Sequence, residues 1–130
     1  MTGYTPYPKQ IKDRRLPHQV VKIDKEISKT ALGAEKTLGV HENINAVLAN
    51  LKKDGFVIAG IEQSKGSVAL PKYQPPNKLA LIVGREVDGI EPEVLKQCEI
   101  ILEIPMFGKK ESFNVVQAAA MTLYHCRFAN

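Results

Sequence analysis

The chain has 130 residues, of which 44% are hydrophobic and 25% are charged, and 18 Lys and Arg against 14 Asp and Glu give a formal net charge of +4. This composition is typical of globular rather than disordered proteins, and the length predicts a single domain over residues 1–130. The longest apolar runs, such as 79–83, have the length of strands, which excludes a transmembrane helix. No basic segment followed by an apolar core opens the chain, so we expect no signal peptide and a cytoplasmic location.

The first part of the chain indicates little regular structure. Residues 1–20 are rich in proline, tyrosine and basic residues and predict an extended loop, while residues 22–36 are compatible with a short helix or an irregular stretch. The first clear helix is 42–54, because its apolar residues recur at helical spacing: Ile44, Val47, Leu48 and Leu51. Gly55 supplies the stop just beyond its C-terminal end.

The remainder of the chain predicts strands alternating with helices. Near-continuous apolar runs, typical of parallel strands buried on both faces, cover 56–61, 79–83 and 100–104. Residues 62–78 contain prolines and a glycine and predict a loop, and Glu91-Pro92-Glu93 opens a short helix. A last helix is expected over 114–127, with Asn114 and Gln117 spaced as in a capping box. The pattern indicates an α/β fold, a parallel sheet flanked by helices.

Cysteine and histidine indicate neither a disulfide nor a metal site. Cys98 and Cys126 lack C-x-x-C spacing, so we expect both to be small apolar residues in or near the core. The histidines are scattered at His18, His41 and His125, outside any H-E-x-x-H motif. We therefore predict no metal.

Polar loops follow all three predicted strands. Glu62-Gln63-Ser64 comes after the first strand, Gly84–Gly89 after the second and Pro105–Asn114 after the third. Ligands of open α/β sheets bind beyond the carboxyl ends of the strands, so these loops are expected to form one site.

The loop Gly84–Gly89 has the glycine spacing of a phosphate loop, but Ile90-Glu91 replaces the required Lys-Ser/Thr. We therefore exclude a P-loop, and no G-x-G-x-x-G motif indicates a dinucleotide site. Glu86 and Asp88 are compatible with a pair of acid/base carboxylates, or Asp88-Gly89 is simply a tight turn. The spacing favours the turn for Asp88 and leaves Glu86 open.

Two motifs in this region carry a family resemblance. Leu81-Ile82-Val83-Gly84-Arg85-Glu86-x-x-Gly89-Ile90 resembles the second signature of the SpoU-type (TrmH-like) RNA ribose 2′-O-methyltransferases of the SPOUT superfamily. Ile104-Pro105-Met106-x-Gly108-x-x-x-Ser112-x-Asn114-Val115 resembles their third signature. The segment Ser28–Glu35 is similar to a stretch found in one branch of the family, and the resemblance runs from Thr2 to Tyr124.

The resemblance implies a parallel α/β sheet with a deep C-terminal trefoil knot, a threading that is otherwise almost absent from proteins. The knot of such proteins forms the pocket for S-adenosylmethionine. The matching positions assign cofactor binding to residues at the strand ends and in the loops that follow: Ile61, Gly84, Ile104, Met106, Ser112 and Phe113.

The implied reaction is methyl transfer to a ribose 2′-hydroxyl of tRNA or rRNA. This hydroxyl is weakly acidic and must be deprotonated or polarised as it attacks the methyl group, so the protein has to supply orientation and electrostatics. Glu86, Ser112 and Asn114 match the polar positions of the two signatures and are the catalytic candidates. Asn114 also stands where a helix N-cap is expected, and the two roles are compatible. Arg85 stands where many relatives carry asparagine and receives no role.

RNA and a second copy of the chain are the expected partners. The basic residues that we assign to RNA are Arg14 and Arg15 in the first loop and Lys109 and Lys110 in the third signature. Relatives of this type are homodimers whose last helix packs across the interface. Ala118, Ala119 and Ala120 would permit such close approach, although packing on the sheet explains them equally well.

The family's first signature, of the type N-x-G-A/S-x-x-R-T-A, does not occur in this chain. The segment Thr2–Pro6 resembles the stretch that follows that signature, so the domain is expected to lack an N-terminal strand–helix unit. The signature's arginine is absent with it. The alternative function is therefore a catalytically impaired fragment that binds cofactor or RNA.

Overall fold

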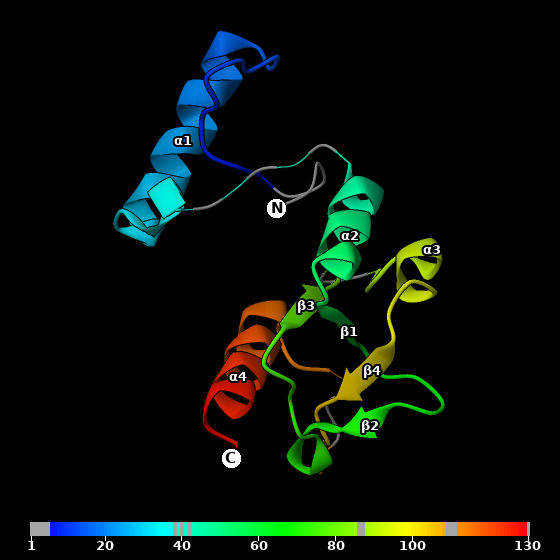
Figure 1. Cartoon of the computed structure of the whole chain (residues 1–130). Helices are drawn as coiled ribbons and strands as arrows, with labels where there is room; N and C mark the ends of the chain where they lie inside the picture. Colours follow the sequence, from blue (N-terminus) through cyan, green and yellow to red (C-terminus); the bar gives the residue numbers. More distant parts are fainter. Residues whose placement is uncertain are drawn as a thin grey trace. The chain divides into compact units, whose positions relative to one another are not determined.

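The computed structural model describes residues 6–37, 39, 41, 43–85, 88–108 and 112–129 (Figure 1). The chain divides into two compact units, one up to Val47 and the other from Leu48 onward. Helix α2 (Ile44–Lys53) runs across this boundary and agrees closely with the expected helix 42–54.

The first unit is built around helix α1 (Pro17–Ala31), followed by the short 3₁₀ helix η1 (Ala34–Thr37). Proline at the first helical position favours a helix start, because its fixed φ is helical and its missing N–H needs no partner there. The prediction of a loop over 1–20 is therefore wrong for residues 17–20. Beyond the helix, Leu32 and Gly33 take positive φ values of 50° and 98°.

The second unit contains a parallel sheet whose described strands lie in the order β2-β4-β1-β3. The strands are β1 (Val57–Ile61), β2 (Val68–Ala69), β3 (Leu79–Val83) and β4 (Ile100–Glu103). This confirms the expected parallel sheet and its three apolar strands. Strand β2 lies inside the segment 62–78 that was predicted to be a loop, because two residues are too few to show a strand period.

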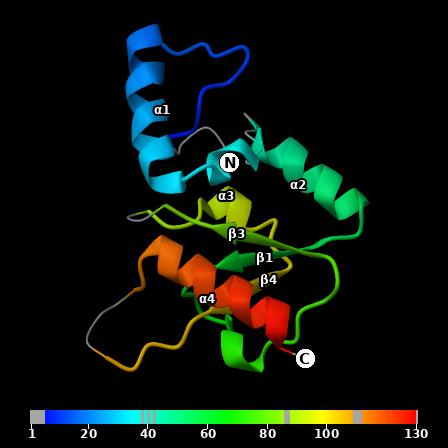
Figure 2. The same ribbon diagram turned by 90° about the vertical axis from the view of Figure 1, so that its left-hand side faces the viewer.

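Alternate residues of the strands supply a core on one face of the sheet. Ala59 and Leu102 are buried together with Leu70 of the 3₁₀ helix η2 (Leu70–Lys72) and with Tyr73. Cys126 of helix α4 (Val115–Phe128) packs against this cluster. Figure 2 shows α4, in orange and red, lying against this side of the strands.

The opposite face of β1 is covered by the chain that follows β3. A Cβ on Gly60 would lie 3.1 Å from both the Ile90 side chain and the Cys98 sulfur, so glycine lets this segment approach the strand closely. Ile90 and Val94 are buried, and Val94 belongs to helix α3 (Pro92–Leu95), which confirms the short helix expected after Glu91. Both faces of the central strand are therefore covered.

Two polar contacts involve α4, one within the helix and one to the segment after η2. The Thr122 side chain is fully buried, and its hydroxyl donates to the Ala118 carbonyl at 2.8 Å. His125 Nε2 lies 2.9 Å from the carbonyl oxygen of Tyr73, which joins the last turns of α4 to the segment after η2. These contacts satisfy buried polar groups that would otherwise destabilise the fold.

Both cysteines are half-buried free thiols, and burial raises the pKa of each above its ordinary value. Their positions beside the sheet agree with the expectation of small apolar residues near the core.

Among the described residues, no group of three or more His, Cys, Asp or Glu side chains is arranged to hold a metal ion. None of the helices among the same residues is long and apolar enough to cross a membrane.

The central strand predicts a clear stability effect. Ile58 is fully buried, so Ile58→Ala should lower the free energy of unfolding by about 2–5 kcal/mol in urea denaturation followed by circular dichroism. Phe107→Ala is the matched control, because its side chain is 98% exposed and its loss should change stability by less than about 0.5 kcal/mol. Equal effects of the two substitutions would contradict this account of the core.

Candidate functional site

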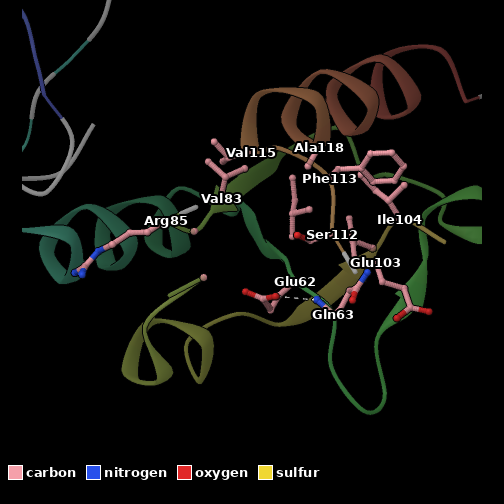
Figure 3. Close-up of a pocket in the computed structure, with 14 residues that line it drawn as sticks. Glu62, Gln63, Val83, Arg85, Glu103, Ile104, Ser112, Phe113, Val115 and Ala118 are labelled. Atoms are coloured by element: carbon pink, nitrogen blue, oxygen red, sulfur yellow. Dashed lines mark hydrogen bonds between the residues drawn. The ribbon is translucent and has the colours of Figure 1, made fainter. Parts of the chain in front are cut away.

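A pocket of about 190 Å³ lies at the carboxyl ends of β1, β3 and β4, and the start of α4 forms part of its wall (Figure 3). Its lining comes from these strand ends and the segments that follow: Ile61, Glu62, Gln63, Val83, Gly84, Arg85, Gly89, Leu102, Glu103, Ile104, Ser112, Phe113, Val115 and Ala118. The three loops expected to share one site do meet. Their convergence follows from the parallel pairing of β1 with both β3 and β4.

Backbone hydrogen bonds join the two ends of the loop after β3. The Arg85 N–H donates to the Gly89 carbonyl at 2.9 Å, and the Gly89 N–H donates to the Arg85 carbonyl at 3.1 Å. Gly89 has a φ of +66°, which glycine adopts without strain. These contacts confirm the turn expected at Asp88-Gly89.

Gly84 brings the two arms of this turn together. A Cβ at this position would lie far inside 3.0 Å of the backbone of Gly89 and Ile90, so only glycine fits the close approach. The Arg85 side chain pairs with Glu91 at 2.5 Å and more distantly with Asp88 at 3.4 Å. Figure 3 shows it pointing away from the other labelled side chains of the pocket.

Glu62, the first residue after β1, connects two walls of the pocket. Its Oε1 accepts a hydrogen bond from the Gln63 N–H at 3.0 Å, and its Oε2 accepts one from the Ile90 N–H at 3.2 Å. The carboxylate thus joins the end of one strand to the exit of the loop that follows its neighbour.

The segment after β4 leads into α4 through a confirmed capping box. The Asn114 side chain accepts from the Val116 N–H at 2.8 Å, and the Gln117 side chain accepts from the Asn114 N–H at 3.4 Å. Asn114 Oδ1 is therefore committed to the helix, while its amide NH₂ remains a donor group at an exposed position. Ser112 is exposed and Phe113 is half-buried at the pocket wall.

The structure brings most of the sequence-predicted cofactor residues together in the pocket: Ile61, Gly84, Ile104, Ser112 and Phe113. Met106 is half-buried and does not line it. Asn114, predicted to be catalytic, stands next to the lining residues Phe113 and Val115. Glu86, predicted to be catalytic, and Lys109 and Lys110, predicted to bind RNA, lie outside the described residues.

Sequence reasoning placed Glu62 in one of the three site loops but gave it no role, and it did not assign Glu103 or Ala118 to the site. The sequence feature that pointed to Glu62 as a site residue was its position directly after a predicted strand. Ala118 lies one helical turn beyond Asn114, so it faces the same side as the helix start. Glu103 ends a strand whose preceding residues are all apolar, so no alternation of polar and apolar residues indicated which face of the sheet Glu103 lies on.

The two arginines predicted to face RNA have different surroundings in the first unit. The Arg15 guanidinium stacks 3.9 Å above the Tyr7 ring, pairs with Asp13 at 2.6 Å and donates to the carbonyls of Tyr7 and Pro8 at 3.0 and 3.3 Å. Its hydrogen bond holds the pKa of Asp13 well below the ordinary value. Arg14 is exposed. Arg15 therefore organises the loop, and Arg14 presents its charge to solvent.

Comparison with known proteins identifies relatives of this arrangement. Residues 12–124 match the model of the SpoU rRNA Methylase family. The tRNA (guanosine(18)-2′-O)-methyltransferase of Borreliella burgdorferi is 32% identical over 95 residues, which cover 72% of this chain. That match covers 44% of the Borreliella protein, so the chain spans less than half the length of this relative.

Solved structures show the same fold. The A. aeolicus TrmH/SpoU tRNA modifying enzyme superimposes with a TM-score of 0.69 at 28% identity, covering 77% of this chain and 52% of that protein. The AdoMet-bound rRNA methyltransferase of Sinorhizobium meliloti has a TM-score of 0.72 at 19% identity, covering 81% of this chain and 41% of that protein. The second likeness concerns the fold alone.

The helix cap beside the pocket predicts a separable effect on stability. Asn114→Ala removes the acceptor for the Val116 N–H and should lower the free energy of unfolding by about 1 kcal/mol. Asn114→Asp should remain close to the wild type, because aspartate is an equally good N-cap and its charge suits the helix N-terminus. Thermal and urea unfolding of both variants measure this difference, and an unaltered Asn114→Ala protein would contradict the capping role.

Proposed function

Because the chain belongs to the SpoU rRNA Methylase family, we propose that it transfers the methyl group of S-adenosylmethionine to a ribose 2′-hydroxyl of tRNA or rRNA. The observation that carries this proposal is the pocket at the carboxyl ends of three parallel strands, because residues of both signature segments line it: Gly84, Arg85, Gly89, Ile104, Ser112, Phe113 and Val115. A cytoplasmic location goes with such substrates. The tRNA named for the Borreliella relative and the rRNA named for the family are the two substrate classes.

The pocket lining suits S-adenosylmethionine. Apolar side chains such as Ile61, Ile104 and Phe113 offer packing surface for an adenine ring. The glycine at position 84 lets the backbone of Gly89 and Ile90 approach closely, which keeps Gly84 and Gly89 together in the pocket wall. Carboxylates of Glu62 and Glu103 favour the cationic part of the molecule. When bound, this cofactor supplies the electrophilic methyl group.

The chain's own residues orient and activate the attacking hydroxyl in this proposal. Ser112 at the pocket wall and the free NH₂ of Asn114 supply hydrogen-bonding groups beside the pocket. Glu86, the polar residue of the second signature, is the candidate that takes or polarises the 2′-hydroxyl proton. Asn114 holds the N-terminus of α4 in place, and this helix end favours a nearby phosphate.

We propose that the chain has the trefoil knot of its family, and the strand order supports this. β4 lies between β1 and β2, and Leu102 stands opposite Ile61 on one side and Val68 on the other. The segment 62–67 therefore crosses the line of β4 where that strand ends. Ser67 Oγ lies 2.5 Å from Glu103 Oε2, which fastens the crossing segment to β4. The chain leaving Glu103 has to pass this crossing on its way to α4.

We also propose a homodimer formed through α4. Large apolar side chains of this helix remain exposed: Val116, Leu123, Tyr124 and Phe128. The rings of Tyr124 and Phe128 lie 4.9 Å apart and form one apolar surface. Exposed aromatic surface of this kind is typical of an interaction site.

The reaction itself is tested with methyl-tritiated S-adenosylmethionine and unmodified tRNA and rRNA transcripts. We expect the label in RNA and, after alkaline hydrolysis, in resistant dinucleotides, because a 2′-O-methyl group removes the hydroxyl that attacks the neighbouring phosphodiester. Label in mononucleotides would place the methyl group elsewhere and contradict ribose methylation. Cofactor binding without transfer to any RNA would favour the binding-only alternative.

Gly84 gives a prediction for cofactor binding. Gly84→Ala forces the turn after β3 apart, so calorimetry should show S-adenosylmethionine binding weakened by at least about tenfold, or 1.4 kcal/mol. Gly108→Ala is the control, because an added Cβ there meets nothing within 4 Å. Unchanged affinity in a folded Gly84→Ala protein would count against the proposed pocket.

The two arginines predict different outcomes in RNA binding. Arg14→Gln should weaken binding and reduce the slope of log K against log salt by about 0.7–0.9, the value for one lost phosphate contact. Its thermal unfolding should not change, because the side chain is exposed. Arg15→Gln should instead loosen the loop that Arg15 joins to Tyr7 and Asp13. An Arg14→Gln protein with the wild-type salt dependence would remove Arg14 from the RNA surface.

A further inference from the structure

We propose that Glu62 is a positioning residue whose carboxylate holds Gly89 and Ile90, after β3, so that Gly89 keeps its place in the wall of the cofactor pocket. The inference rests on the proposed function, since it assigns the residue a part in binding S-adenosylmethionine. Neither family signature in the sequence includes this position. The assignment comes from the contacts that Glu62 makes in the folded chain.

The first step is the bridge between two strands. Glu62 Oε2 accepts from the Ile90 N–H at 3.2 Å, across 28 residues of sequence, while Oε1 accepts from the adjacent Gln63 N–H at 3.0 Å. Both oxygens are thus engaged by backbone donors, one on each side of the pocket wall. Both distances lie within the ordinary range of roughly 2.7–3.2 Å for N–H···O hydrogen bonds. Figure 3 shows the Glu62 side chain among the lining residues, with its bond to Gln63 dashed.

The second step is the close packing of this carboxylate on the turn. A Cβ on Gly89 would overlap Glu62 Oε2, so the glycine allows the carboxylate to lie directly against the backbone of the turn. Gly89 also has a φ of +66°, a region that other residues adopt with strain. The glycine and the glutamate are therefore matched in shape, although they stand on different loops.

The third step concerns the exit of the turn. Ile90 is buried, and its side chain reaches Gly60, which is two residues before Glu62 on the same face of β1. Ile90 is therefore held by an apolar contact at Gly60 of β1 and by a polar contact at Glu62, the first residue after β1. The entrance of the turn is held separately by the paired backbone groups of Arg85 and Gly89. With both ends fixed, Gly84, Arg85 and Gly89 keep their places in the pocket wall.

Removing the carboxylate should loosen one wall of the pocket without unfolding the sheet. Glu62→Gln leaves a single acceptor oxygen for two backbone donors, and Glu62→Asp keeps the charge but shortens the reach to Ile90. We expect both variants to bind S-adenosylmethionine about tenfold more weakly in calorimetry, and to show faster hydrogen exchange at the Ile90 amide. In methyl transfer, the KM for S-adenosylmethionine should rise while kcat at saturation changes less than threefold.

Glu93→Gln is the matched control, because the Glu93 side chain on α3 is 81% exposed. In the described part of the chain, its one salt bridge is to Lys96, which is also exposed. The substitution removes the same charge and should keep the wild-type affinity for S-adenosylmethionine and the wild-type hydrogen exchange at the Ile90 amide.

A second test uses Gly89→Ala. Its loss of affinity should be smaller in a Glu62→Ala background, because the clash with the carboxylate is gone and only the strained φ remains.

The outcomes separate this inference from the proposed function. Wild-type affinity for S-adenosylmethionine in Glu62→Gln would overturn the positioning role. Loss of affinity in Glu62→Gln with full affinity in Glu62→Asp would also overturn it, because Glu62 would then act through its charge alone. A lowered melting temperature with unchanged affinity and unchanged Ile90 exchange would make Glu62 merely structural and overturn it too. A wild-type protein that does not bind S-adenosylmethionine would overturn the proposed function and this inference together.

Discussion

The pairing of β1 with both β3 and β4 is the constraint on which the rest of the second unit depends. β1 runs parallel to each neighbour, with Ile61 opposite Val83 on one side and Leu102 on the other, so three strands end at the same level. Three polar segments far apart in the sequence are thereby delivered to one edge. The apolar character of β1 on both faces supports this arrangement, since Ile58 and Ala59 are fully buried against opposite layers.

Close backbone approach then shapes the edge into a pocket. Gly60 admits the Ile90 side chain against the sheet, and Gly84 admits the backbone of Gly89 and Ile90. Each glycine gives up side-chain packing to allow a contact that no larger residue permits. The stability of the sheet, the conformation of the turn and the shape of the pocket are therefore coupled through the same few atoms.

The predictable part of the fold was the part with a local pattern. The strand 79–83 and the capping box at Asn114 are visible as apolar runs and residue spacing, and both are confirmed. Strand β2 was missed because its two residues pair with the distant β4 and have no period of their own. In the site, Glu62 was recognised only as a polar residue after a strand, because its partner Ile90 becomes a neighbour only when β1 and β3 pair.

The charged residues show why type and position are insufficient to assign a role. Arg14 and Arg15 are equivalent in sequence, yet Arg15 is committed to Tyr7 and Asp13 while Arg14 is exposed. The helix uses only one end of the Asn114 side-chain amide: Oδ1 accepts from the Val116 N–H and caps α4, while the NH₂ group takes no part in the cap. A side chain with two distinct hydrogen-bonding ends can thus stabilise the fold and serve the site together. A carboxylate whose two oxygens both accept from backbone donors, as in Glu62, is better suited to holding the site than to proton transfer.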